Sequence, residues 1–189
     1  MSRSCCPPPH FFNPDDKRSY LLTVFLSSPF VTLAVPMEAG GFRPFDFPSQ
    51  TGIYALYLSE VSLSETVTPQ QRNEDLRDDL LVTLRMQLVY IGKTSHRGTL
   101  RGRLADHYRK IDSRRGLSVD RILVRYLVIE DDWNTLFAEY KLVEAPELSA
   151  EPPPPWNTNG FGMHAPGAGR PGKRAKPANH FDVLYPPKK

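Results

Sequence analysis

Cysteine is scarce in this sequence, and the two cysteines present, Cys5 and Cys6, are adjacent. Neighbouring cysteines are poor candidates for an intrachain disulfide and lack the spacing of a metal site. We therefore expect a reducing, cytoplasmic setting. The sequence also lacks a long apolar run, because Ser27 and Pro29 interrupt the apolar patches of residues 20–35. That segment is too short and too broken to span a membrane, so we expect no membrane partner.

Charge is modest in total, with a formal net charge of +3, but it is unevenly distributed. Residues 93–125 contain ten Lys or Arg against three Asp, whereas residues 59–79 contain six Asp or Glu against two Arg. A basic stripe suits binding to a phosphate backbone, although a charge run is often only a solvated surface. At 189 residues and 40% hydrophobic content, the chain has the size and composition of one domain with its own core.

Three runs rich in β-branched and aromatic residues predict strands at residues 52–58, about 84–91 and 121–129. Alternate side chains of a strand share a face. If the first two strands pair antiparallel, Tyr54 and Tyr90 can therefore lie close together at one end of the ribbon. The alternative is a strand pair with ordinary half-buried tyrosines.

Helices are predicted at about residues 20–26, 100–110 and 134–144. On the second of these helices Arg103 and His107 are four residues apart, so they share one face. That face could bring a guanidinium and an imidazole to the two phenols. A solvated basic helix is the other interpretation of the same spacing.

The pair Gly52-Ile53-Tyr54 and Tyr90-Ile91-Gly92 resembles the signature of the GIY-YIG nucleases. Over about residues 12–186 the chain is similar to the restriction-endonuclease branch of that family that cuts a GC-only palindrome of the CCGCGG type. The flanking segments that carry this closer resemblance are, in chain order, Phe12-Asn13-Pro14-Asp15-Asp16-Lys17, Arg103-Leu104-Ala105-Asp106-His107, Val124-Arg125-Tyr126-Leu127-Val128, Trp156-Asn157 and Gly160-Phe161-Gly162-Met163-His164.

The resemblance implies an α+β fold: a small core with a three-stranded antiparallel sheet flanked by helices, an N-terminal arm and an extended C-terminal tail. The expected organisation is a disordered N-terminus at residues 1–11, a helix and irregular arm at 12–50, a catalytic core at 51–157 with an acidic insertion at 60–79 and a proline-rich insertion at 145–155, and a basic, loop-like tail at 158–189. The tail departs from the family, since His164-Ala165-Pro166 stands where the family has His-Asp-Pro.

The resemblance also implies hydrolysis of DNA phosphodiester bonds with Mg²⁺, for which Mn²⁺ is a possible substitute. Tyr54 would activate or orient the attacking water, with its pKa lowered by the metal, by Arg103 or by a relay through His107. Tyr90 would hydrogen-bond the phosphate or the nucleophile, and Arg103 would hold the scissile phosphate. Asn157 would position the site from the far side. The implied metal ligand is Glu139, with Glu144 as the alternative because the proline-rich insertion follows this segment.

Cutting both strands of a palindrome favours a homodimer on double-stranded DNA. A cognate DNA methyltransferase is the expected genetic partner. Two other functions stay open: another GIY-YIG DNA nuclease of repair or of a mobile element, and a catalytically inactive DNA-binding relative. The basic candidates for substrate binding are Lys93, Arg97, Arg101, Arg114, Arg115 and Arg170.

Overall fold

The computed structural model describes residues 14–66, 85–94, 98–129, 132–143, 154–159, 161 and 180–188. Several predictions lie outside these residues. They are the disordered N-terminus at 1–11, most of the acidic and proline-rich insertions, the substrate-binding candidates Arg97 and Arg170, and the alternative metal ligand Glu144.

A four-stranded antiparallel sheet forms the centre of the fold, in the order β1-β6-β4-β5. Its strands are β1 (Phe30–Thr32), β4 (Gly52–Ser59), β5 (Met86–Lys93) and β6 (Ile122–Val128). The predicted α+β class and the three predicted strands are confirmed, but the predicted sheet was one strand short. β1 was missed because a three-residue strand is too short to display an alternating pattern.

The predicted irregular arm is wrong for part of its length, because β2 (Ala34–Pro36) and β3 (Phe42–Pro44) pair as an antiparallel hairpin. Its turn contains Gly40 and Gly41, both with positive φ. Only glycine adopts that conformation without steric cost, so the Gly-Gly pair suits the turn of the hairpin.

Helix α4 (Leu100–Asp112) is capped by Thr99, whose side chain accepts a hydrogen bond from the backbone N–H of Gly102. Its buried residues, Leu100, Leu104, His107 and Ile111, follow the three-to-four-residue spacing of one helix face. The other helices are α1 (Pro14–Ser27), α2 (Leu63–Thr66), α5 (Asp132–Val143), α6 (Pro155–Thr158) and α7 (His180–Leu184), with a 3-10 turn at Val119–Arg121.

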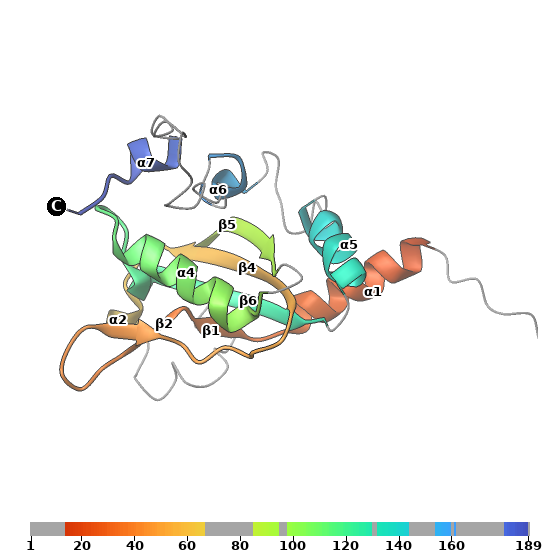
Figure 1. Cartoon of the computed structure of the whole chain (residues 1–189), viewed down its shortest axis with the longest axis horizontal. Helices are drawn as coiled ribbons and strands as arrows, with labels where there is room; N and C mark the ends of the chain where they lie inside the picture. Colours follow the sequence, from red (N-terminus) through yellow and green to blue (C-terminus); the bar gives the residue numbers. More distant parts are fainter. Residues whose placement is uncertain are drawn as a thin grey trace, which may run out of the picture.

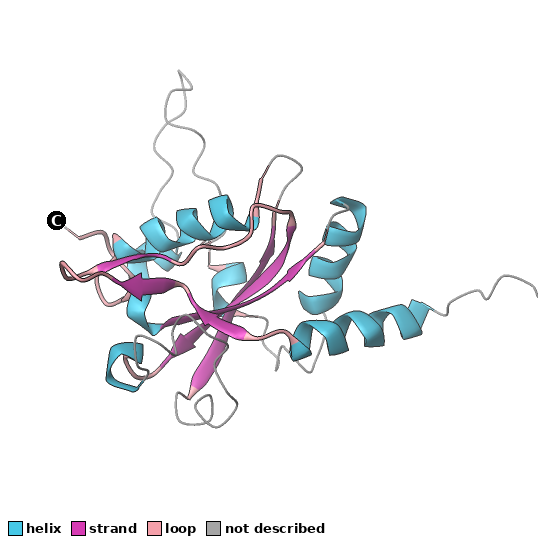
Figure 2. Cartoon of the chain, turned by 90° about the horizontal axis from the view of Figure 1, so that it is seen from below, coloured by secondary structure: helices cyan, strands magenta, loops and turns pink. Residues whose placement is uncertain are grey.

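The two faces of the sheet carry separate cores. α4, α6 and α7 contribute to the cluster that contains Tyr54 and Tyr90, whereas α1, α2 and α5 contribute to the cluster that contains Ile53 and Tyr57. Figure 1 shows α4 crossing one face of the sheet, with α5 and α1 together at one end. In Figure 2, the view from below, α1 extends away from the sheet beside α5.

The C-terminal tail contributes to the core of the fold. The C-terminal tail was predicted to be loop-like, but α7 lies within it and its Phe181 is fully buried. Within the described residues, no helix combines the length and the apolar character needed to cross a membrane.

Candidate active site

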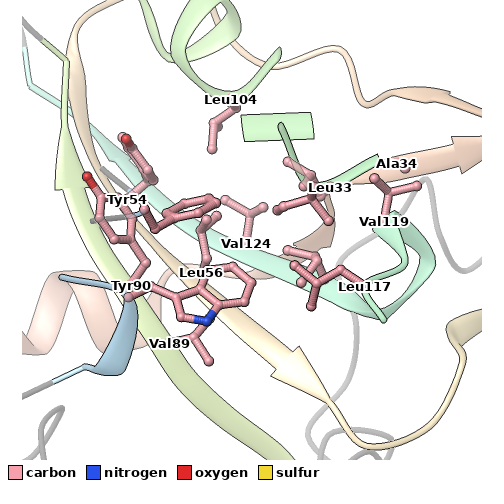
Figure 3. Packing of buried hydrophobic residues seen from close by; sticks show 14 of the residues in the cluster. Leu33, Ala34, Tyr54, Leu56, Val89, Tyr90, Leu104, Leu117, Val119 and Val124 are labelled. Carbon is pink, nitrogen blue, oxygen red and sulfur yellow. The ribbon is translucent and has the colours of Figure 1, made fainter. Parts of the chain in front are cut away.

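The two tyrosines of the signature lie together on the α4 face of the sheet. Tyr54 pairs with Gly92 and Leu56 with Tyr90 in the β4–β5 register, so both phenols occupy the same face on neighbouring strands. Their ring centroids are 6.1 Å apart, and Figure 3 shows the two rings side by side. A Cβ at Gly92 would lie 2.6 Å from Cε1 of Tyr90 and 2.7 Å from Oη of Tyr54. The glycine of the second tripeptide therefore makes room for the tyrosine pair.

Gly52, the glycine of the first tripeptide, allows close packing of neighbouring elements. A Cβ at this position would collide with the backbone carbonyl oxygen of Leu127 on β6 and touch Leu100 at the start of α4. Its backbone N–H donates to Oγ1 of Thr94 at 3.0 Å. Gly52 thus lets β4 pack closely against β6 and α4 at the end of the strand that carries the tyrosine.

Helix α4 brings His107 and Arg103 to Tyr54, as the four-residue spacing predicted. The Tyr54 Oη and His107 Nε2 atoms are 2.7 Å apart, and the Arg103 Nε–H donates to Tyr54 Oη at 3.3 Å. His107 is only 3% exposed, so it belongs to the core as much as to the site. A buried imidazole and phenol of this kind satisfy each other by hydrogen bonding. When Arg103 donates to the phenol oxygen, the phenol proton is free to bond to Nε2 of a neutral imidazole.

Burial sets the protonation of the two phenols. Desolvation raises the pKa of Tyr54 well above 10.0, with the nearby Tyr90 adding to the rise and Arg103 opposing it. Desolvation also raises the pKa of Tyr90, and Arg103 again opposes the rise. Both tyrosines are therefore neutral near pH 7, and either could act as a base only by passing its own proton onward.

Glu139 approaches from the other side of the sheet, on α5. Its Oε2 atom lies 3.3 Å from the Nζ atom of Lys93 at the end of β5, and both side chains are about a quarter exposed. The Glu139 charge contributes to the raised pKa of both Tyr54 and Tyr90. This carboxylate is therefore paired with an ammonium group and lies within electrostatic reach of the two tyrosines.

A closed metal cage is not formed here, since the described residues contain no group of three or more His, Cys, Asp or Glu side chains able to hold a metal. A single carboxylate is nevertheless sufficient for Mg²⁺, which keeps several of its waters and shares substrate phosphates. Among the described residues the contact of the Glu139 carboxylate is the Lys93 ammonium group, and one carboxylate does not make a structural zinc site.

Asn157 is a backbone clamp in this structure. Its Oδ1 accepts from the Ile91 N–H at 2.8 Å, and its Nδ2 donates to the Ile91 carbonyl at 2.7 Å. Because β5 is an edge strand, the amide takes the place of a neighbouring strand and fastens α6 beside Tyr90. Asn157 therefore contacts the strand of Tyr90 through the backbone of Ile91, and its positioning role in the reaction stays a prediction.

The basic residues predicted to bind substrate are placed differently from one another. Arg114 is largely buried, pairs with Asp182 at 2.8 Å and donates to the Tyr185 carbonyl, which ties α7 to the end of α4. Arg101 pairs with Asp46 and donates to the Phe47 carbonyl. Arg115 is exposed. Substrate binding by these residues stays a prediction, and Arg114 has an evident structural task.

Phe161 is the residue at this site to which sequence reasoning gave no role. Its ring stacks on the His107 imidazole with centroids 4.8 Å apart and an interplanar angle of 18°. It also meets the edge of Tyr90 at 5.2 Å. Phe161 lies in the segment Gly160-Phe161-Gly162 that carried part of the resemblance, but a glycine-flanked phenylalanine gives no indication of its partner.

Comparison with known families agrees with the geometry. The family model described as the Eco29kI GIY-YIG domain matches residues 46–189, which is more than half of the chain. A search of curated proteins returned no match. The matched region contains both tyrosines, Arg103, His107, Glu139 and Asn157. The chain therefore belongs to the Eco29kI GIY-YIG family, a restriction-endonuclease family whose members act on DNA.

Proposed function

We propose that this protein is a type II restriction endonuclease that hydrolyses both strands of DNA at a short palindromic site with Mg²⁺. The observation that carries the proposal is the contact of Tyr54 with His107 and Arg103 in one buried network beside Tyr90. The same polar contacts could satisfy buried groups in a structural core, and the match of this chain to the GIY-YIG family favours the catalytic interpretation. Glu139 supports the hydrolytic interpretation, because its carboxylate lies beside Lys93 at the end of β5 and is the kind of oxygen ligand that Mg²⁺ prefers.

The proposed proton path begins at the attacking water. As the water oxygen forms a bond to phosphorus and the bond to the 3′ oxygen breaks, Tyr54 takes the water proton and passes its own proton to Nε2 of His107. The 2.7 Å separation supports this transfer. A relay is required because burial holds Tyr54 neutral and thereby prevents it from acting as a preformed phenolate.

Arg103 and Tyr90 would act on the phosphate itself. The guanidinium is planar and permanently charged, so it can offset the negative charge that develops as water attacks. Tyr90, which is 6% exposed, would donate its phenol proton to a phosphate oxygen. Glu139 would be the residue that holds Mg²⁺, which when bound would supply positive charge for phosphodiester hydrolysis. Lys93 would then exchange its carboxylate partner for a phosphate or a water.

Symmetry supplies the second active site in this proposal. A palindrome presents the same sequence on both strands, so a homodimer related by a two-fold axis would place one site on each strand. A cytoplasmic enzyme of this kind endangers its own host, which is why a cognate methyltransferase is the proposed genetic partner. The recognition sequence proposed from the family resemblance is of the GC-only CCGCGG type.

A plasmid cleavage assay with Mg²⁺ tests the proposal. Wild-type protein should give discrete fragments, and Glu139→Gln should abolish cleavage while DNA still shifts in a gel. Glu60→Gln is the matched control, since Glu60 is an exposed carboxylate paired with Arg85. Nicking or structure-dependent cutting would replace the proposal with another GIY-YIG nuclease activity. Binding without any cleavage by the wild-type protein would indicate an inactive DNA-binding relative.

A further inference from the structure

We infer that Phe161 is a positioning residue that fixes the plane of the His107 imidazole, and this inference rests on the proposed nuclease function. Among the described residues, the rings of Tyr54, Tyr90 and Phe161 lie around the imidazole, with centroids 5.5, 5.2 and 4.8 Å away. The two tyrosines meet it at steep angles, whereas Phe161 lies nearly parallel to it. Phe161 is thus the ring whose flat face opposes rotation of the imidazole.

The orientation of this imidazole matters because a hydrogen bond weakens steeply as its angle departs from linearity. Rotation about the bond to the ring would move Nε2 away from the Tyr54 oxygen, to which it now stands at 2.7 Å. The rotation of a His ring about χ2 is intrinsically broad, so packing must select the productive angle. A stacked ring that is itself only 2% exposed provides that selection.

Phe161 is in turn held firmly from behind. Its ring packs against Trp156 at 4.6 Å and Phe181 at 4.9 Å. The Nζ atom of Lys110 donates to the Phe161 carbonyl at 2.6 Å and lies 5.0 Å from the centroids of both the Phe161 and Phe181 rings. Lys110 follows His107 by three residues on α4, so one helix carries both the imidazole and the tether for its stacking partner.

The same contacts could also belong to an ordinary aromatic core, and the two interpretations differ in what a substitution changes. In an ordinary core, Phe161→Leu and Phe181→Leu would both reduce stability and leave the Tyr54–His107 hydrogen bond intact. If Phe161 positions His107, Phe161→Leu changes the state of the imidazole directly. Phe181→Leu, which only loosens the support behind Phe161, then changes it much less. Phe181 is the matched control because it is the same residue type, fully buried, in the same cluster.

The test combines kinetics with NMR of the histidine ring nitrogens in the full-length protein. The His107 signals are assigned by comparison with a His107→Gln variant, since the chain has five histidines. We expect Phe161→Leu to shift the ring-nitrogen resonances of His107 and to slow single-turnover DNA cleavage about 100-fold, the cost of a small misplacement. The dissociation constant for DNA, measured with Ca²⁺ in place of Mg²⁺, should stay within about twofold of the wild-type value, since Phe161 is buried and contacts no substrate.

A second variant covers the case in which Phe161→Leu does not fold. Lys110→Met removes the tether to the Phe161 carbonyl without opening a cavity beside the imidazole, and it should change the same resonances and rate in the same direction by a smaller amount. Resonances and cleavage rates that match those of Phe181→Leu would overturn the inference. If the wild-type protein cuts no DNA, the proposed function fails, while the ring-nitrogen comparison still decides whether Phe161 orients His107.

Discussion

Tyr54 and Tyr57 lie on opposite faces of the same strand, and each has an arginine nearby. On the α4 face Arg103 donates to the Tyr54 hydroxyl. On the α1/α5 face Arg125 acts electrostatically on Tyr57 and stacks 4.0 Å from the centroid of the Phe30 ring, which itself meets Tyr57 edge-on. Burial raises the pKa of both tyrosines.

The two faces differ in the other residues that surround each tyrosine–arginine pair. Tyr54 has the imidazole of His107 at hydrogen-bond distance, a second phenol beside it and the charge of Glu139 within electrostatic reach. Tyr57 is surrounded by the apolar cluster formed with α1, α2 and α5. A buried tyrosine beside an arginine is therefore not by itself a site. The partner that can accept a proton gives the α4 face its chemistry.

The largest expected difference comes from removing each tyrosine hydroxyl in turn. We expect Tyr54→Phe to slow DNA cleavage by about 10²–10⁴-fold, the range for loss of a group that transfers a proton in the transition state. Tyr57→Phe should leave the rate per folded molecule unchanged, because its hydroxyl belongs to the opposite core. Single-turnover cleavage at saturating protein measures both variants. Equal losses of cleavage rate from the two substitutions would show that the two faces do not differ in function.

The two arginines provide the next test, with charge held constant. Arg103→Lys keeps a positive charge but removes the planar fork, so we expect about a 10²–10³-fold loss of cleavage rate, comparable to removal of one preorganised donor. Arg125→Lys should leave cleavage intact and change only the unfolding midpoint in urea. A cleavage rate for Arg103→Lys close to that of wild type would mean that the phosphate is held elsewhere.

Gly92→Ala tests whether DNA cleavage depends on the present positions of Tyr54 and Tyr90. The new methyl group would press on both phenols, and a displacement of this kind should reduce the cleavage rate about 100-fold. Gly102→Ala on α4 is the control, since its Cβ would meet only Oγ1 of Thr99 at 3.4 Å and alanine favours a helix. Circular dichroism should show both variants folded before their cleavage rates are compared.

Sequence patterns predicted the parts of this molecule that are long or periodic. β4, β5, β6, α4 and α5 were all expected within about two residues of their observed ends, and the approach of Arg103 and His107 to Tyr54 followed from helical spacing. Short elements such as β1 and α7 were missed, because three to five residues carry too little periodicity.

Contacts fixed by tertiary packing were also beyond the reach of the sequence. Nothing in the sequence indicated that Phe161 would stack on His107, that the Asn157 amide would act through the Ile91 backbone, or that Asp182 would engage Arg114. Each of these contacts joins residues more than 50 positions apart, and it depends on how the chain returns to the sheet.

The smallest expected difference between the two faces is in how the free energy of unfolding falls at alkaline pH. A tyrosine whose pKa is raised on folding stabilises the protein fully below its unfolded pKa of about 10, and that stabilisation is lost as the pH rises through the folded value. Each such tyrosine contributes a slope of up to about 1.4 kcal/mol per pH unit. Because the Tyr54 pKa is raised well above 10.0 by burial and by Tyr90, against the opposing effect of Arg103, its contribution should extend to higher pH than that of Tyr57. Urea unfolding between pH 9 and 12 should therefore show a shallower decline for Tyr54→Phe than for Tyr57→Phe, whereas parallel curves would place both phenols in equivalent environments.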